Sequence, residues 1–444
     1  MLDKIENSFK DLLSTLQSAK LYTTKHPMFA KSLDKAFASM QEVFRDRQEL
    51  VIGIIGDELA FEKEVFFDLS KTIKPAIIYL KERGIERIVF LRGLDKEELF
   101  SFIEFLTLPK EEATVNPQEY LKLKGVRNIS VGKIQGAASQ AEGQKPLESS
   151  DIYSSSLKNI SQSLTSVLDK EAIDHLNLKF SINNIMENLS GNYQEFLRLA
   201  TVKRYDVATY EHMLNVSILA MYFSSKLRFN KTDIMDIGIA AMFHDIGKLY
   251  ISRKILTKTN GLTDEEFSKI KNHAILGSEI LLRYVDNLGI LPPVVAFEHH
   301  LKYNLSGYPK SPFLKKPHIA SLIVSICDVY DALSERRGYK NDYAPDLVYS
   351  IMIKEKGTTF EPMLLDKFFK FTGVWPIGSI IALDDGRVAI VRDENEEDIR
   401  LPKVEVISPE GNKEIIDLLQ KKGTLGIKRF LNPWKEGKDY LHLI

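Results

Sequence analysis

The residues best suited to chemistry in this chain are histidines and aspartates, beginning with the pair His244-Asp245. His244 lies four and seven residues after Ala240 and Ile237, so the spacing places it on the apolar stripe of a helix. A carboxylate beside a half-buried imidazole is costly to desolvate unless a cation or a hydrogen-bond donor meets it. A metal ion would satisfy both groups.

Further histidines and aspartates extend this pattern along the chain. They open or close segments of helical periodicity, include no cysteine, and lie at His212, His273, His299, His300 and Asp328. A two-metal hydrolytic site needs such ligands from several helices, because each ion takes several protein ligands and one carboxylate bridges the pair. For any single histidine the alternative is a hydrogen-bonded core residue.

In this order the residues resemble the HD superfamily of metal-dependent phosphohydrolases. The segment Ser306-Gly307-Tyr308-Pro309, soon after the histidine doublet, narrows the resemblance to the HD-GYP branch, whose known members cleave cyclic di-GMP. The resemblance runs roughly from Tyr210 to Lys340, about a third of the chain, and as a joint pattern it is specific.

The resemblance implies two divalent metal ions that share one bridging carboxylate, Asp245. One ion would bind His212, His244, Asp245 and Asp328, and the other would bind Asp245, His273, His299 and His300. Family members of this kind commonly hold iron or manganese, and the ligand types do not exclude zinc. A hydroxide that bridges the two ions would attack the phosphorus atom, so Asp245 is also counted as catalytic.

The resemblance also assigns residues to the substrate. Lys248 is expected to be catalytic, by neutralising a phosphate oxygen or assisting the leaving group; the alternative is a helix-end lysine that stabilises the helix dipole. Tyr308 can stack on a guanine and Gly307 can let the backbone approach a phosphate, unless the segment is only a turn. The expected substrate-binding set is Lys248, Gly307, Tyr308, Pro309, Lys310 and Arg337.

Some positions around the signature depart from the family pattern. Leu301 replaces an acidic residue after the doublet, Asn304-Leu305 replaces Asp-Gly, and Lys310 replaces an arginine. These changes leave the metal ligands intact. They bear on the substrate, because lysine lacks the two-pronged geometry with which arginine holds a phosphate or a guanine edge.

The leading hypothesis is therefore a phosphodiesterase that hydrolyses cyclic di-GMP to pGpG, and onward to GMP. Two alternatives stay open. The first is a catalytically silent signalling module that binds metal or nucleotide, and the second is an HD phosphohydrolase that acts on another cyclic dinucleotide or nucleotide.

Length and composition limit the class of protein. A chain of 444 residues with 44% hydrophobic and 27% charged residues predicts a soluble protein of two or three domains. A net charge of -1 argues against a nucleic-acid polymer as partner, and no apolar run approaches the roughly 20 residues that span a bilayer. With a single cysteine, Cys327, a reducing, cytoplasmic location is expected.

The periodicity predicts a multidomain chain. A small α/β domain at 1–134 is expected to regulate, to form a homodimer or to bind a protein partner, and a flexible linker follows at 135–150. An all-α bundle of the HD-GYP-like phosphohydrolase type would occupy 151–373, and a small β-rich appendage 374–444. Local signals include hairpin turns at Gly56-Asp57 and Asp384-Asp385-Gly386 and a capping box formed by Asp95 and Glu98.

Overall fold

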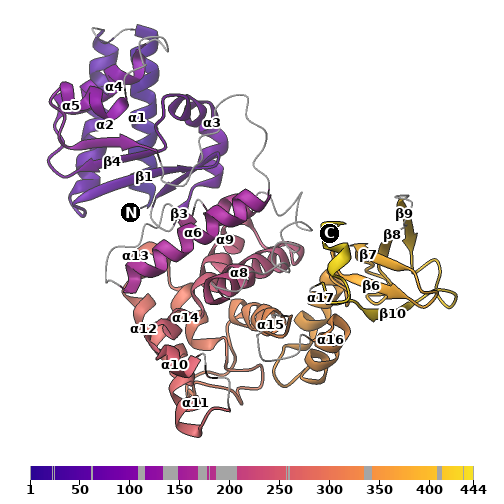
Figure 1. The fold of residues 1–444 in the computed structure, drawn as a ribbon. Helices are drawn as coiled ribbons and strands as arrows, with labels where there is room; N and C mark the ends of the chain where they lie inside the picture. Colours follow the sequence, from indigo (N-terminus) through magenta and orange to yellow (C-terminus); the bar gives the residue numbers. More distant parts are fainter. Residues whose placement is uncertain are drawn as a thin grey trace. The chain divides into compact units, whose positions relative to one another are not determined.

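A computed structural model gives the fold of the chain (Figure 1). It describes residues 2–22, 24, 26–61, 64–108, 116–133, 149–168, 178–179, 181–186, 208–256, 258, 261–334, 343–407, 413–433 and 435–443. The chain divides into two compact units, one of Met1–Gln144 with Asp174–Phe180, the other of Lys145–Ile173 with Ser181–Ile444. Most of the predicted linker, residues 135–148, lies outside the described residues.

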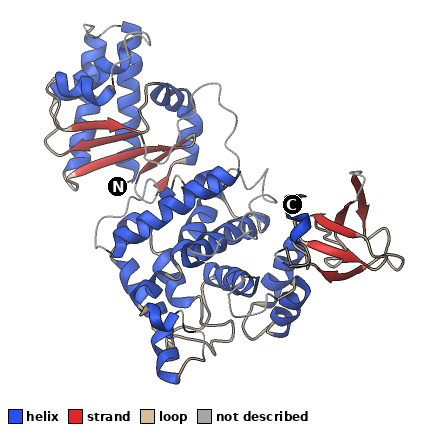
Figure 2. Cartoon of the chain, viewed as in Figure 1, coloured by secondary structure: helices blue, strands red, loops and turns tan. Residues whose placement is uncertain are grey.

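The first unit is a five-stranded antiparallel sheet with helices, as the sequence predicts for an α/β region (Figure 2). The strands follow the order β3-β2-β1-β4-β5 and are β1 (Glu49–Ile55), β2 (Glu58–Phe61), β3 (Glu64–Val65), β4 (Arg87–Leu91) and β5 (Ile129–Gly132). The helices are α1 (Leu2–Tyr22), α2 (Pro27–Phe44), α3 (Phe67–Glu82), α4 (Lys96–Thr107) and α5 (Pro117–Leu123).

Both local signals predicted in this unit are present. Gly56, at φ 60°, and Asp57 form the turn between β1 and β2, where Ile55 pairs with Glu58. The Asp95 side chain accepts a hydrogen bond from the Glu98 amide while Glu98 caps the Asp95 amide in return, which begins α4. The prediction of a hairpin and a capping box is confirmed.

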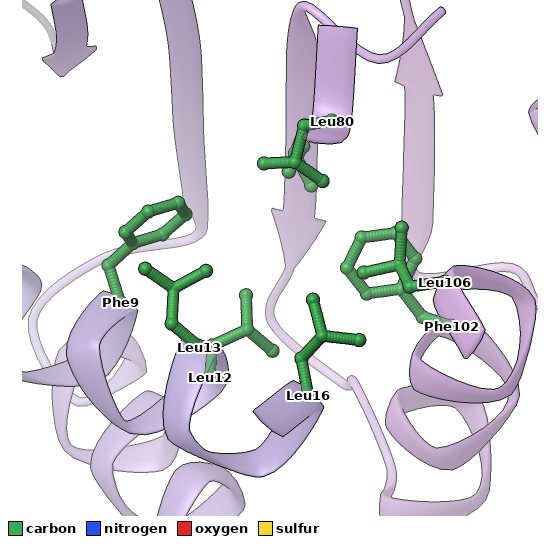
Figure 3. Close-up of a pocket in the computed structure, with 8 residues that line it drawn as sticks. Phe9, Leu12, Leu13, Leu16, Leu80, Phe102 and Leu106 are labelled. Atoms are coloured by element: carbon green, nitrogen blue, oxygen red, sulfur yellow. The ribbon is translucent and has the colours of Figure 1, made fainter. Parts of the chain in front are cut away.

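The core of the first unit is mainly apolar, and apolar side chains line a small cavity within it (Figure 3). Side chains of α1 face Leu80 of α3 and residues of α4 across it, and the lining residues are Phe9, Leu12, Leu13, Leu16, Leu80, Ile88, Phe102 and Leu106. Such a lining offers no polar group that could orient a nucleotide.

The second unit is mainly helical. Its longer elements are α6 (Ser149–Leu168), α8 (Ala208–Lys226), α9 (Lys231–Phe243), α12 (His273–Leu282), α14 (Leu291–Glu298) and α15 (Ile319–Ser334). Shorter elements complete it: the 3-10 helix η1 (Ile246–Tyr250), α10 (Arg253–Leu256), α11 (Asp264–Lys271), α13 (Val285–Leu288), α16 (Pro345–Lys354) and α17 (Pro362–Thr372).

Helix α9 occupies the centre of this bundle, in contact with α8, α14 and α15. All residues from Ile234 to Phe243 except Asp236 are buried. The sequence analysis expected a single apolar stripe on this helix. The buried surface of α9 is wider than that, because a helix surrounded by other helices buries its whole circumference.

A second antiparallel sheet follows the helices, in the same compact unit. Its strands β6 (Ile380–Leu383), β7 (Val388–Asp393), β8 (Lys403–Ile407), β9 (Lys413–Asp417) and β10 (Ile427–Phe430) follow the order β10-β6-β7-β8-β9, and the 3-10 helix η2 (Lys438–Leu443) comes last. The predicted turn at Asp384-Asp385-Gly386 joins β6 to β7. None of the described helices combines the length and apolar character that a bilayer crossing demands.

Gly247 of η1 allows the segment that follows α9 to pack closely against α12. A Cβ atom at this position would collide with the carbonyl oxygen of His273 and would lie 2.7 Å from the amide nitrogen of Gly277. Both obstacles are backbone atoms of α12, so neither can rotate away. Only glycine allows this close approach, which fixes the position of the His244-Asp245 segment.

We predict that Gly247→Ala lowers the free energy of unfolding by at least about 2 kcal/mol, because the added methyl group must push η1 away from α12. Gly261→Ala is the matched control, since a Cβ there meets no atom within 4 Å, and its effect should stay within about 0.5 kcal/mol. Chemical denaturation measures both. Equal stability of the two variants would contradict the packing described for Gly247.

Candidate metal centre

The structure brings all seven predicted metal ligands together in the second unit. Most lie at helix ends: His244 ends α9, Asp245 begins η1, His273 begins α12, and His299 ends α14. Two groups result, each with ligand atoms within 4.8 Å of one another: His212, His244 and Asp328 in one, and Asp245, His273, His299 and His300 in the other.

Asp245 lies between the two groups, with its side chain only 1% exposed. Its Oδ1 atom lies 3.3 Å from Nε2 of His273 and 3.7 Å from Nε2 of His299. Its Oδ2 atom lies 3.5 Å from Nε2 of His244 and 3.8 Å from Nε2 of His212. Each oxygen therefore faces one group, which is the arrangement that a bridging carboxylate requires.

Backbone carbonyls orient three of the histidines. In each case Nδ1 lies near the carbonyl oxygen three residues earlier, at 2.6, 2.6 and 2.9 Å for His244, His273 and His299. Because a carbonyl only accepts, each Nδ1 carries the hydrogen, and a neutral ring then presents its Nε2 lone pair to the cluster. Such a hydrogen bond behind the ring is a regular feature of metal-binding histidines.

A carboxylate orients the fourth histidine. Nδ1 of His212 lies 2.7 Å from Oδ2 of Asp331, and its Nε2 lies 3.1 Å from Oδ1 of Asp328. Asp331 belongs to the run Asp328–Leu333 that resembles the family, but the sequence analysis assigned no role to it. Its position one helical turn after Asp328 in α15 places both carboxylates on the face toward α8.

The charges of the cluster depend on one another. Burial alone would raise the pKa of Asp245, but Lys248 and His244 outweigh burial and hold that pKa well below its usual range. Burial would lower the pKa of His212 and of His244, yet the neighbouring aspartates raise these values to about 9 and about 10. The buried carboxylates thus require positive charge, and a divalent cation can supply it in place of protons.

Two further observations show that the donor set fits a metal. The buried atoms His244 Nε2 and Asp245 Oδ1 have no hydrogen-bond partner among the described residues. Nε2 of His273 lies 3.2 Å from Nε2 of His299, and burial lowers the pKa of His273 to about 4. Because Nδ1 of each ring carries the hydrogen toward a carbonyl, the two Nε2 atoms face each other, and a shared cation can bind both. Nitrogen and oxygen donors without sulfur suit iron, manganese or zinc.

Comparison with known proteins agrees with this geometry. Residues 185–364 match a family model described as the HD domain. This part of the chain, less than half of its length, is therefore similar to the HD domain. The resemblance to HD-GYP proteins predicted from the sequence is confirmed by this match together with the curated relatives.

Three relatives illustrate the similarity. A cyclic di-GMP phosphodiesterase of Pseudomonas aeruginosa is 28% identical over 255 residues, which are 56% of this chain and 61% of that protein. A cyclic di-GMP phosphodiesterase of Thermotoga maritima is 30% identical over 197 residues, 43% of this chain and 54% of the relative. A 3'3'-cGAMP-specific phosphodiesterase of Vibrio cholerae is 28% identical over 207 residues, 45% and 40% of the two chains. Less than two thirds of each relative is covered.

Two residues expected to meet the substrate lie against the predicted metal ligands. The Lys248 ammonium forms an ion pair with Asp245 Oδ2, and its side chain is 25% exposed. The Tyr308 ring lies 4.7 Å from the His300 ring, tilted by 38°. Burial, and then the charge of Asp245, raises the pKa of Tyr308, so its hydroxyl stays protonated.

Gly307 packs against the backbone of His300 and Leu301. A Cβ atom there would collide with the carbonyl oxygen of His300 and lie 2.7 Å from that of Leu301. The amides of Gly307 and Tyr308 donate to these carbonyls of Leu301 and His300, both at 2.9 Å. Backbone packing by itself therefore requires glycine at this position. The approach of a phosphate to Gly307 stays a prediction.

The other residues predicted to bind substrate lie farther from the predicted metal ligands or outside the described residues. Pro309 is buried after a cis peptide bond, and the exposed Lys310 donates to the carbonyl oxygen of Ser306 at 2.8 Å. Arg337 lies outside the described residues. Glu298, which the sequence analysis did not single out, accepts hydrogen bonds from the His318 amide and the Ser321 hydroxyl and so connects α14 to α15.

We predict that Asp245→Ala removes both metals, because each histidine group then loses its shared carboxylate. Metal content measured by mass spectrometry should fall from about two ions per chain to near zero, while circular dichroism shows an unchanged helical content. Asp286→Ala, at an exposed position of α13, is the control and should keep the wild-type content. A normal metal content in Asp245→Ala would refute the assignment of this residue.

Asp331→Asn should weaken metal binding without abolishing it, since the amide keeps the shape of the side chain but loses the charge behind His212. We expect the metal dissociation constant to rise by about 10- to 100-fold. Competition with a chelator of known affinity gives this constant. An unchanged value would show that Asp331 does not support His212 as a ligand.

Proposed function

We propose that the HD domain is a metal-dependent phosphodiesterase that hydrolyses a cyclic dinucleotide, with cyclic di-GMP as its substrate and pGpG as the first product. The observation that carries this proposal is the position of Asp245, with one carboxylate oxygen toward each histidine group. The names of the relatives from Pseudomonas aeruginosa and Thermotoga maritima support the substrate.

Two ions, with iron or manganese favoured, would share the ligands through Asp245. His212, His244 and Asp328 would complete the first site, and His273, His299 and His300 the second. When bound, two such cations supply Lewis acidity that makes water a nucleophile at neutral pH and neutralises the charge of the phosphate.

The chain's own residues would bind and orient the substrate. Lys248 already reaches the centre from the partly exposed side, and its ammonium can move from Asp245 to a phosphate oxygen or to the departing sugar oxygen. The protonated Tyr308 hydroxyl can donate a hydrogen bond to the substrate. The deeply buried ligands exclude water from the far side of the centre, which strengthens these interactions.

A second candidate substrate is 3'3'-cGAMP. The relative from Vibrio cholerae that is named for this dinucleotide supports it, as does the presence of Lys310 where an arginine often follows the signature. Lysine makes a single point contact and therefore selects less strictly for a guanine edge. The remaining alternative is a signalling module that binds metal or nucleotide. It differs from both enzymes because it does not hydrolyse the nucleotide.

The test is a turnover assay of the full chain, loaded with manganese or ferrous iron under reducing conditions, with cyclic di-GMP and 3'3'-cGAMP in parallel. We expect chromatography to show pGpG from cyclic di-GMP, at a higher kcat/KM than for 3'3'-cGAMP, and no product with Asp245→Ala. Faster turnover of 3'3'-cGAMP would establish the second candidate. Full metal content without turnover of either dinucleotide would refute the proposed activity.

A further inference from the structure

Lys271 lies beside the signature tyrosine without being part of the metal centre. It ends α11, two residues before the ligand His273, and is half-buried. Its Nζ atom lies over two aromatic rings, 4.3 Å from the ring centroid of Phe267 and 5.8 Å from that of Tyr308. Phe267 precedes it by one helical turn and is 44% exposed.

The charge of Lys271 is not neutralised by a carboxylate among the residues that the structure describes. The acidic side chains of α11 act at the opposite end of the helix, where Glu266 pairs with Lys258 at 2.6 Å and Glu265 accepts from the Thr263 hydroxyl. Two aromatic faces attract an ammonium group but accept none of its hydrogen bonds strongly. Lys271 therefore keeps donors available for an anion.

The other lysines near the centre are engaged differently. Lys248 pairs with Asp245, and Lys310 donates to a backbone carbonyl. Tyr308 connects Lys271 to the centre, because its ring contacts the His300 ring on one side and lies within 5.8 Å of the Lys271 ammonium. Lys271 is thus a cation adjacent to the metal site and outside its ligand set.

We propose that Lys271 binds the phosphate of the dinucleotide half that is not cleaved, and that Phe267 positions it for this contact. The inference rests on the proposed function: a cyclic dinucleotide carries two phosphates, and when the metal centre takes one, the second needs a cation nearby. The alternative is a helix-end lysine that only stabilises the helix dipole. That role would apply equally to the exposed Lys269 of the same helix.

The experiment compares Lys271→Ala with Lys269→Ala in the metal-loaded full chain, using two substrates. Cyclic di-GMP has the second phosphate, whereas bis(p-nitrophenyl) phosphate has only one. We expect Lys271→Ala to raise KM for cyclic di-GMP roughly tenfold, with a much smaller change in kcat, and to leave bis(p-nitrophenyl) phosphate turnover and metal content unchanged. Lys269→Ala should behave as wild type with both substrates.

Phe267→Ala tests the positioning role. It should raise KM for cyclic di-GMP by a smaller factor, roughly threefold, and should add nothing in the background of Lys271→Ala, because the ring acts only through the lysine. Equal increments in both backgrounds would overturn this role for Phe267.

Three results would overturn the inference about Lys271. Equal KM values of Lys271→Ala and Lys269→Ala for cyclic di-GMP would mean that Lys271 only stabilises the helix dipole. A parallel loss of bis(p-nitrophenyl) phosphate turnover would mean that Lys271 acts through His273 and not on the second phosphate. A wild-type protein that cleaves bis(p-nitrophenyl) phosphate but no cyclic dinucleotide would refute the proposed function itself, and the subsite with it.

Discussion

The buried carboxylate of Asp245 is the group on which the rest of the site depends. A charge in the protein interior is costly to desolvate and must be balanced by nearby positive charge. Lys248 and His244 provide that balance at the Oδ2 atom, whereas the Oδ1 atom faces the neutral ring of His273 and would meet a cation only when a metal is bound. Helices α8, α9, α12, α14 and α15 must therefore converge on one side chain, and Gly247 permits the close packing that brings α12 there.

Carbonyl groups at helix ends orient the imidazole rings of three predicted ligands. The last carbonyls of a helix have no partner within the helix. The carbonyls behind His244, His273 and His299 belong to the final turns of α9, α11 and α14. Each of these carbonyls accepts a hydrogen bond from Nδ1 and so directs Nε2 toward the centre. The end of a helix thus places a carbonyl group within reach of the ring that it orients.

The types and the order of the proposed ligands could be predicted from the sequence, because histidines and aspartates are easily recognised within apolar helical segments. The sequence did not reveal the role of Asp331, which has the pattern of an ordinary polar helix residue until His212 of α8 is placed against it. The packing role of Gly307 likewise depends on the return of the chain to His300. The sequence analysis predicted a β-rich region at 374–444 without the bounds of β9 and β10, because charged residues interrupt their apolar pattern, as Lys428 and Arg429 do in β10.

The most direct test of the two-metal account is electron paramagnetic resonance of the manganese-loaded chain, with the metal content determined on the same sample. Two ions that share the Asp245 carboxylate should be magnetically coupled and give the spectrum of a manganese pair at about two ions per chain. A spectrum of isolated manganese, at one ion per chain or at two uncoupled ions, would contradict a centre bridged by Asp245.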